Sequence, residues 1–381
     1  MSARKIVQWH DAGLIDAATR DRLLAYETEH ARPLVLWAVF GIGALAIGLG
    51  LVSVIAANWE DIPGLVRLSV HFALMAGMLA ALFLREERLA QRSPWAVEAL
   101  VFVTAALGLT FFGHLGQVYQ TSAPLWQPLA LWLALFAPLL LLMGRSWPAA
   151  LAVLGGSVWT VWEYASANTA YGVILDTGWS VWLAFATALP VAFAALAAGM
   201  RGRSARPDFW RRLEQLALAY AVCGASFACA VASAGGFHQS ALSREAASVL
   251  TSGAVAVLAG LGVLLARPTV SGQMAGAIIA GAGLAVPIAY VTDGATVPAA
   301  LLFMALWAGI AAAALTAQWR GVFQLAVGVI ALRLIILSFE LAGDLLTSGF
   351  GLILSGVMIL AVAWVAVRVS RRFAPREEPG A

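Results

Sequence analysis

The sequence predicts an all-α polytopic membrane protein with about 12 transmembrane helices, and three observations support this fold class. Hydrophobic residues make up 62% of the 381 residues and charged residues only 11%, whereas soluble domains carry about 25% charged residues. The apolar residues fall into runs close to the roughly 20 residues that a helix needs to cross about 30 Å of hydrocarbon. The basic residues gather in alternate connecting segments, as the positive-inside rule requires.

The N-terminal 32 residues are the only extended polar segment before the C-terminal tail. Asp16 is placed to cap a helix, and Leu23, Leu24 and Tyr26 give that helix an apolar side. We therefore expect a short cytosolic helical hairpin. A polar stretch precedes an apolar run that is too long for a signal peptide, so we expect no cleavable signal.

Apolar runs follow the hairpin along the rest of the chain. They lie near 34–57, 64–84, 95–114, 128–143, 148–164, 179–200, 213–235, 246–266, 271–291, 296–317, 320–339 and 348–368. The runs at 128–143 and 148–164 are short and are joined by "GRSWP". They are consistent with two thin spans or with one re-entrant pair, so the predicted number of spans is 10 to 12.

Charge asymmetry favours twelve spans with both termini in the cytoplasm. With a cytosolic N-terminus, all but three of the 23 Lys and Arg residues fall on the cytoplasmic side. The exceptions are Arg67 and Arg244 on the outer side and Arg333 within a span. The predicted organisation is a cytosolic segment at 1–32, six spans within 33–200, a basic loop at 201–212, six spans within 213–368 and a cytoplasmic tail at 369–381.

Polar residues accumulate at the outer ends of the predicted spans. In "GLTFFGHLGQVYQTSAPLWQP" (108–128), Thr110, His114 and Gln117 follow a spacing that places them on one helix face. Arg333 lies within a span, where an arginine costs about 2.5–3.5 kcal/mol on insertion scales, so we expect it to have a buried partner. Glu340 on the same helix, Glu163 and His114 are the candidate partners. The candidate residues of a solute or ion pathway are Asn58, His114, Gln117, Tyr119, Glu163, Arg333 and Glu340.

Each candidate also has a structural interpretation. Tyr119 fits an aromatic belt at the lipid headgroups, and Asn58 fits the end of a helix. His71 and His114 fit hydrogen-bonded packing residues. A purely structural ion pair explains Arg333 as well as a functional one does.

Several classes of function lack their sequence signatures. The chain contains no GxxxxGK[ST], HExxH or GxSxG motif and no metal-spaced His/Cys group. We therefore predict no catalytic residues, no metal and no cofactor. The arginines lie at the predicted membrane face, where anionic lipid is their natural partner, so we predict no nucleic-acid binding.

Two stretches resemble a known family. "GALAIGLGLVSVIAANWEDIPGLVRL" and "LTFFGHLGQVYQTSAPLWQPLALWLALFAPLLLLMGRS" are similar to bacterial predicted membrane proteins of the domain of unknown function 2157, and residues 8–145 carry the resemblance. The family's signature positions correspond to Asn58, Trp59, Gln117 and Tyr119. Many relatives have an apolar residue where His114 stands. The resemblance implies an architecture and no established activity.

Three hypotheses follow for a multi-pass protein of the bacterial inner membrane. The first is binding or transport of a small solute through an outward-facing polar site, with a proton as the coupled ion. The second is a non-enzymatic membrane scaffold that docks a membrane or cytosolic protein. The third is an enzyme acting on a lipid-linked substrate, for which only Glu163 with His114 offers an acid/base pair. We predict the lipid bilayer as a partner and leave the oligomeric state open.

Overall fold

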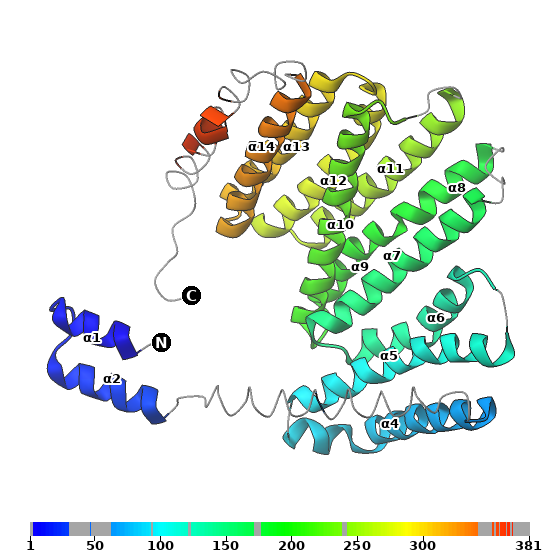
Figure 1. The fold of residues 1–381 in the computed structure, drawn as a ribbon, viewed down its shortest axis with the longest axis vertical. Coiled ribbons are helices and arrows are strands. Elements are labelled where there is room, and N and C mark those ends of the chain that lie inside the picture. The colour runs from blue at the N-terminus through cyan, green and yellow to red at the C-terminus, as the bar shows by residue number, and fades with distance from the viewer. Residues whose placement is uncertain are drawn as a thin grey trace. The chain divides into compact units, whose positions relative to one another are not determined.

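The computed structural model describes residues 3–29, 62–92, 94–120, 123–170, 177–237 and 242–341, with isolated positions at 46 and between 353 and 368. All regular structure within these ranges is helical, which agrees with the predicted fold class (Figure 1). The helices are α1 Ala3–Asp11, α2 Ala17–Glu29, α4 Gly64–Arg92, α5 Pro94–Tyr119, α6 Trp126–Met143, α7 Trp147–Ala170, α8 Thr177–Ala188, α9 Ala192–Arg201, α10 Pro207–Ser233, α11 Leu242–Ala266, α12 Val270–Val291, α13 Thr296–Thr316 and α14 Arg320–Leu341.

The chain divides into two compact units, residues 1–67 and residues 68–381. In the first unit, α1 and α2 contact each other, as expected for a helical hairpin. The amide of Thr19 donates a hydrogen bond of 2.7 Å to Asp16 Oδ1, so Asp16 caps α2 as predicted. This bond lowers the pKa of the Asp16 carboxyl, because it favours the ionised form.

Nine helices in the described part of the chain are long and apolar enough to cross a membrane. The protein is therefore a multi-pass membrane protein. The predicted spans 34–57 and most of 348–368 lie outside the described residues. The count of twelve, the division into six and six, and the cytoplasmic termini stay predictions.

The two short runs near residue 145 form separate continuous helices, α6 and α7. The 24 residues of α7 would extend about 36 Å at 1.5 Å per residue, which is long enough to cross a bilayer. However, α7 is not among the nine apolar candidates. Its polar outer half, "WTVWEYASANTA", explains the difference.

The basic loop predicted at 201–212 is mostly helical. α9 ends at Arg201 and α10 begins at Pro207, so α10 starts six residues before the predicted apolar run. Pro207 is the first residue of α10, where its missing N–H costs nothing. Phe209 and Trp210 are buried and anchor this turn in the core.

One predicted span is divided by a proline. α8 and α9 are joined by the 3₁₀ turn Leu189–Val191, and together they cover the candidate span Ser180–Arg201. Pro190 lies in this turn because proline has no backbone N–H to donate to the hydrogen bonds of an α-helix. The span therefore continues through a change of helical pitch.

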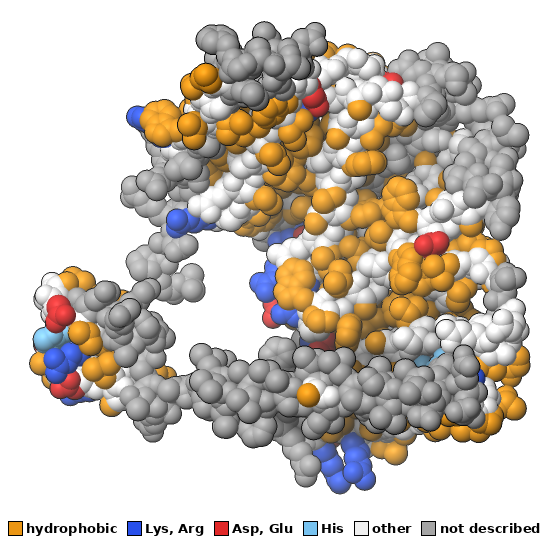
Figure 2. Space-filling model, in the orientation of Figure 1, with side chains coloured by type: hydrophobic (Ala, Val, Ile, Leu, Met, Phe, Trp, Pro, Cys, Tyr) orange, Lys and Arg blue, Asp and Glu red, His pale blue; other side chains and the backbone are white. Residues whose placement is uncertain are grey.

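Glycines bring α11 and α12 into backbone contact. A methyl group added at Gly260 would lie 2.6 Å from the carbonyl oxygen of Gly276, and one added at Gly253 would lie 2.7 Å from that of Gly283. Small residues at such positions let helices approach closely where lipid supplies no hydrophobic drive for association. Hydrophobic side chains cover much of the visible surface of the protein (Figure 2).

Candidate functional site

Arg333 on α14 is buried and paired. Arg333 is 6% exposed. Its Nη1 donates a hydrogen bond of 2.9 Å to Glu340 Oε1, two turns further along the same helix. Its Nη2 donates to Ser233 Oγ of α10 at 2.6 Å. Of the three partners that the sequence suggested, Glu340 is the one that the structure pairs with Arg333.

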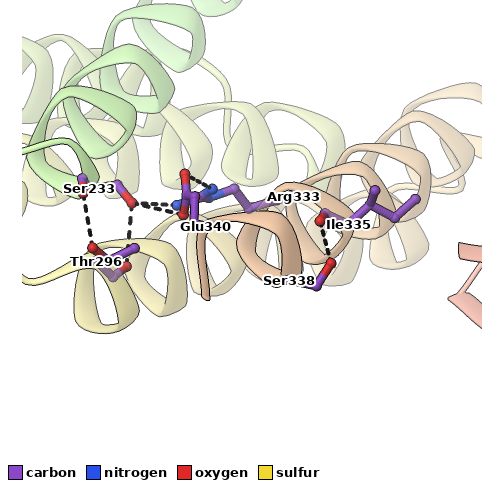
Figure 3. A network of polar contacts seen from close by, with 6 residues as sticks. All are labelled: Ser233, Thr296, Arg333, Ile335, Ser338 and Glu340. Carbon is purple, nitrogen blue, oxygen red and sulfur yellow. Dashed lines mark hydrogen bonds and ion pairs between the residues drawn. The ribbon is translucent and has the colours of Figure 1, made fainter. Parts of the chain in front are cut away.

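Ser233 connects this pair to a third helix (Figure 3). Its hydroxyl lies 3.4 Å from the backbone oxygen of Thr296 and 3.4 Å from Glu340 Oε2, while the Thr296 hydroxyl donates to the Ser233 carbonyl at 3.3 Å. The network therefore joins α10, the start of α13 and α14. Holding three helices together in this way is the role of a structural ion pair. The Glu340 side chain is about one-third exposed, so part of it remains accessible from the surface.

A second polar group joins His71 on α4 to His114 on α5. The two Nδ1 atoms are 3.0 Å apart, and His71 Nε2 is 2.9 Å from the carbonyl oxygen of Leu107. His71 is buried and its ring also meets the edge of Phe111 at 5.4 Å between centroids. Thr110 donates to the same Leu107 carbonyl at 3.0 Å. The sequence analysis interpreted both histidines as hydrogen-bonded packing residues, but it did not place them in contact.

This contact assigns the protons of the pair. A carbonyl oxygen only accepts, so Nε2 of His71 must carry a hydrogen. In the neutral pair, Nδ1 of His71 then has a lone pair and His114 Nδ1–H donates to it. If a proton binds Nε2 of His114, the shared proton can cross to His71 Nδ1 without breaking the contact. A further proton would set N–H against N–H in this contact.

The other candidates occupy the C-terminal parts of α5 and α7. Trp159 Nε1 donates to Glu163 Oε1 at 3.1 Å, and both side chains are at least partly exposed. Gln117 and Tyr119 are exposed. α5 continues through them, five residues past the predicted end of the span, until Gln120 adopts a φ of 52° and its side chain donates to the Gln117 carbonyl at 2.8 Å.

The candidates thus form separate contact groups. The Arg333 group lies on α10, α13 and α14, whereas the histidine contact lies on α4 and α5 and the Glu163 contact lies on α7. A cavity of about 480 Å³ lies between the C-terminal part of α5 and the N-terminal part of α6, lined by Phe112, Gly116, Gln127 and Trp159 among others. Asn58 lies outside the described residues.

Two further carboxylates lie near the N-terminal ends of α5 and α10. Glu98 of α5 accepts hydrogen bonds from the amides of Arg145 and Ser146 at 2.8 and 3.0 Å. Glu214 is 3% exposed and pairs with Arg267 and, at 3.4 Å, with Arg201. The sequence contained no signal for Glu214, because its arginine partners come from other helices.

Arg206 differs from the prediction that the basic loop faces lipid. Its guanidinium donates to the carbonyl oxygens of Gly144 at 2.6 Å and Leu141 at 2.5 Å, which are unpaired at the end of α6. Burial lowers the pKa of this guanidinium, and the charge of Arg145 acts in the same direction. Arg206 therefore caps the C-terminal end of α6.

One segment of the chain matches a known protein family. Residues 7–149 match the model of a family described as predicted membrane protein (DUF2157). This match confirms the resemblance stated on residues 8–145 and includes the end of α1 and all of α2, α4, α5 and α6. No curated protein and no solved structure matches the chain.

Proposed function

We propose that the protein binds and moves a small solute across the bacterial inner membrane through polar residues at the outer ends of its spans, with a proton as the coupled ion. The observation that carries the proposal is the contact of 3.0 Å between His71 and His114. Ionisable side chains within membrane spans are rare, and they often mark substrate or proton pathways.

The histidine contact supports proton coupling because it can exchange one proton between two helices. His114 is partly exposed and His71 is buried. A proton that arrives at His114 changes which imidazole donates in the contact between α4 and α5. Solute that favours one of these two protonation states would therefore couple its binding to proton uptake.

Reconstituted vesicles offer the test. The full chain is placed in liposomes that enclose a pH-sensitive dye, and an imposed potassium diffusion potential drives proton entry. We expect acidification above that of empty vesicles, and a loss of at least tenfold in His114→Gln and in His71→Gln. Val103→Ala, which changes an exposed apolar residue of the same helix outside the candidate pathway residues, serves as the control. Equal rates in wild type, His114→Gln and His71→Gln would contradict proton coupling through this pair.

A membrane scaffold is the second candidate, and the separate N-terminal unit favours it. α1 and α2 lie in their own compact unit, and Leu14 in the turn between them is 72% exposed. A partner protein that recognises this unit would make residues 1–32 essential. Under this function, deletion of 1–32 abolishes activity in cells, while Arg333→Ala lowers only the amount of folded protein.

A further inference from the structure

A second cavity, of about 790 Å³, opens between α10, α12, α13 and α14. It also touches the ends of α7, α9 and α11 that are predicted to face the cytoplasm. Its size falls within the range of about 300–1,000 Å³ that is typical of small-molecule sites. It shares no lining residue with the histidine contact or with the Arg333 network.

The cytoplasmic end of this cavity is positively charged. Arg201, Arg211 and Arg267 line it, and Glu214 is the one carboxylate among its described lining residues. Glu214 pairs with Arg201 and Arg267 and so holds both guanidinium groups at the cavity. The Arg211 side chain is 47% exposed and its ion pair is with Asp208, which is 68% exposed. The lining therefore keeps an excess of positive charge beside water.

Beyond Gln215 and Ser271, the remainder of the cavity is mainly apolar. Leu218 and Val222 of α10, Ile278 of α12 and Ile310 of α13 form its walls, together with Trp307 and Trp319. From Arg211 to Val222 the α10 backbone rises about 16 Å at 1.5 Å per residue. This depth is about half of the 30 Å hydrocarbon core, which corresponds to one leaflet.

We propose that this cavity binds an anionic phospholipid from the cytoplasmic leaflet. The headgroup phosphate accepts hydrogen bonds from guanidinium N–H groups at the charged end, where each arginine offers five donors. One acyl chain lies along the apolar walls. A soluble anion would use only the charged end, and a zwitterionic lipid would not match the excess positive charge.

Two variants separate this site from general lipid contact. Arg211→Gln removes a charge at the cavity without leaving Glu214 unpaired, and Arg203→Gln is its control because Arg203 is exposed and lies outside the lining. Ala219→Trp fills the cavity from an exposed lining position of α10. Ala230→Trp is its control, because it is an exposed alanine of α10 outside the lining.

The experiment is native mass spectrometry of the full chain in detergent, titrated with phosphatidylglycerol, with phosphatidylcholine or with inorganic phosphate. We expect one phosphatidylglycerol per chain to remain bound under conditions that remove phosphatidylcholine. Arg211→Gln should weaken this binding about fivefold, as expected for one arginine at a membrane surface. Ala219→Trp should abolish it, and both controls should bind as wild type does.

Three outcomes would overturn the proposal. Equal retention of the two lipids would mean contact without recognition. Equal weakening by Arg211→Gln and Arg203→Gln would mean attraction by surface charge alone. Binding of phosphate that persists in Ala219→Trp, without lipid binding in wild type, would identify an anion site in place of a lipid site.

Discussion

Replacing Gly276 by alanine tests the backbone contact between α11 and α12 directly. The added methyl group would lie 2.7 Å from the carbonyl oxygen of Gly260 and 3.0 Å from the amide nitrogen of Leu264. A carbon and a carbonyl oxygen normally approach to about 3.3–3.6 Å. The helices must therefore separate by about 0.6–0.9 Å at this point, because both groups belong to the backbone of α11 and cannot rotate away.

This separation has a cost of about 1–3 kcal/mol, the range for overpacked sites. A gap of this size removes about a quarter to a half of the van der Waals attraction between the atoms along the contact. Gly281→Ala is the matched control, because a methyl group at Gly281 meets nothing within 4 Å. Alanine also favours helix over glycine by about 1 kcal/mol, so the control should be neutral or stabilising.

The assay is reversible unfolding of the purified chain in mixed micelles with increasing dodecyl sulfate, followed by circular dichroism. We expect a lower midpoint for Gly276→Ala and an unchanged or higher midpoint for Gly281→Ala. Adding Gly260→Ala to Gly276→Ala should cost less than the sum of the two single changes, because the first change has already separated the helices. Equal midpoints for Gly276→Ala and Gly281→Ala would refute the backbone contact.

Three other changes test the remaining polar contacts. Arg333→Ala leaves Glu340 without its cation and should destabilise the protein by about 3 kcal/mol, the lower end of the range for a broken buried ion pair. The double variant Arg333→Met with Glu340→Gln should recover stability in the same unfolding assay. A double variant as unstable as Arg333→Ala would contradict this expectation. Glu98→Ala removes the charged acceptor of the Arg145 and Ser146 amides and should cost about 1–3 kcal/mol in that assay, whereas Glu98→Gln should cost less because it keeps one acceptor. Because folding lowers the pKa of Asp16, its contribution to α2 is present above the ordinary pKa of 3.8 and is lost as the pH falls through the folded pKa. The Thr19 amide chemical shift should follow this titration in wild type and stay constant in Asp16→Asn.

Local and one-dimensional features could be predicted from the sequence. A span in lipid must satisfy its backbone groups within its own helix, so apolar run length by itself identifies α4 to α6 and α10 to α14 as membrane helices. The Asp16 cap and the Arg333–Glu340 pair also involve residues close along one helix. Their spacing predicted the cap and made Glu340 one of three candidate partners of Arg333.

Contacts between helices required the tertiary structure. His71 meets His114 and Ser233 meets Arg333 between two helices, and Glu214 of α10 meets Arg267 in the turn between α11 and α12. Such a pair depends on the rotation and the height of each helix relative to its neighbour, and hydropathy constrains neither. The sequence by itself thus determined that the chain folds as helices in lipid, whereas packing between helices decided which ionisable side chains are neutralised and which line a cavity.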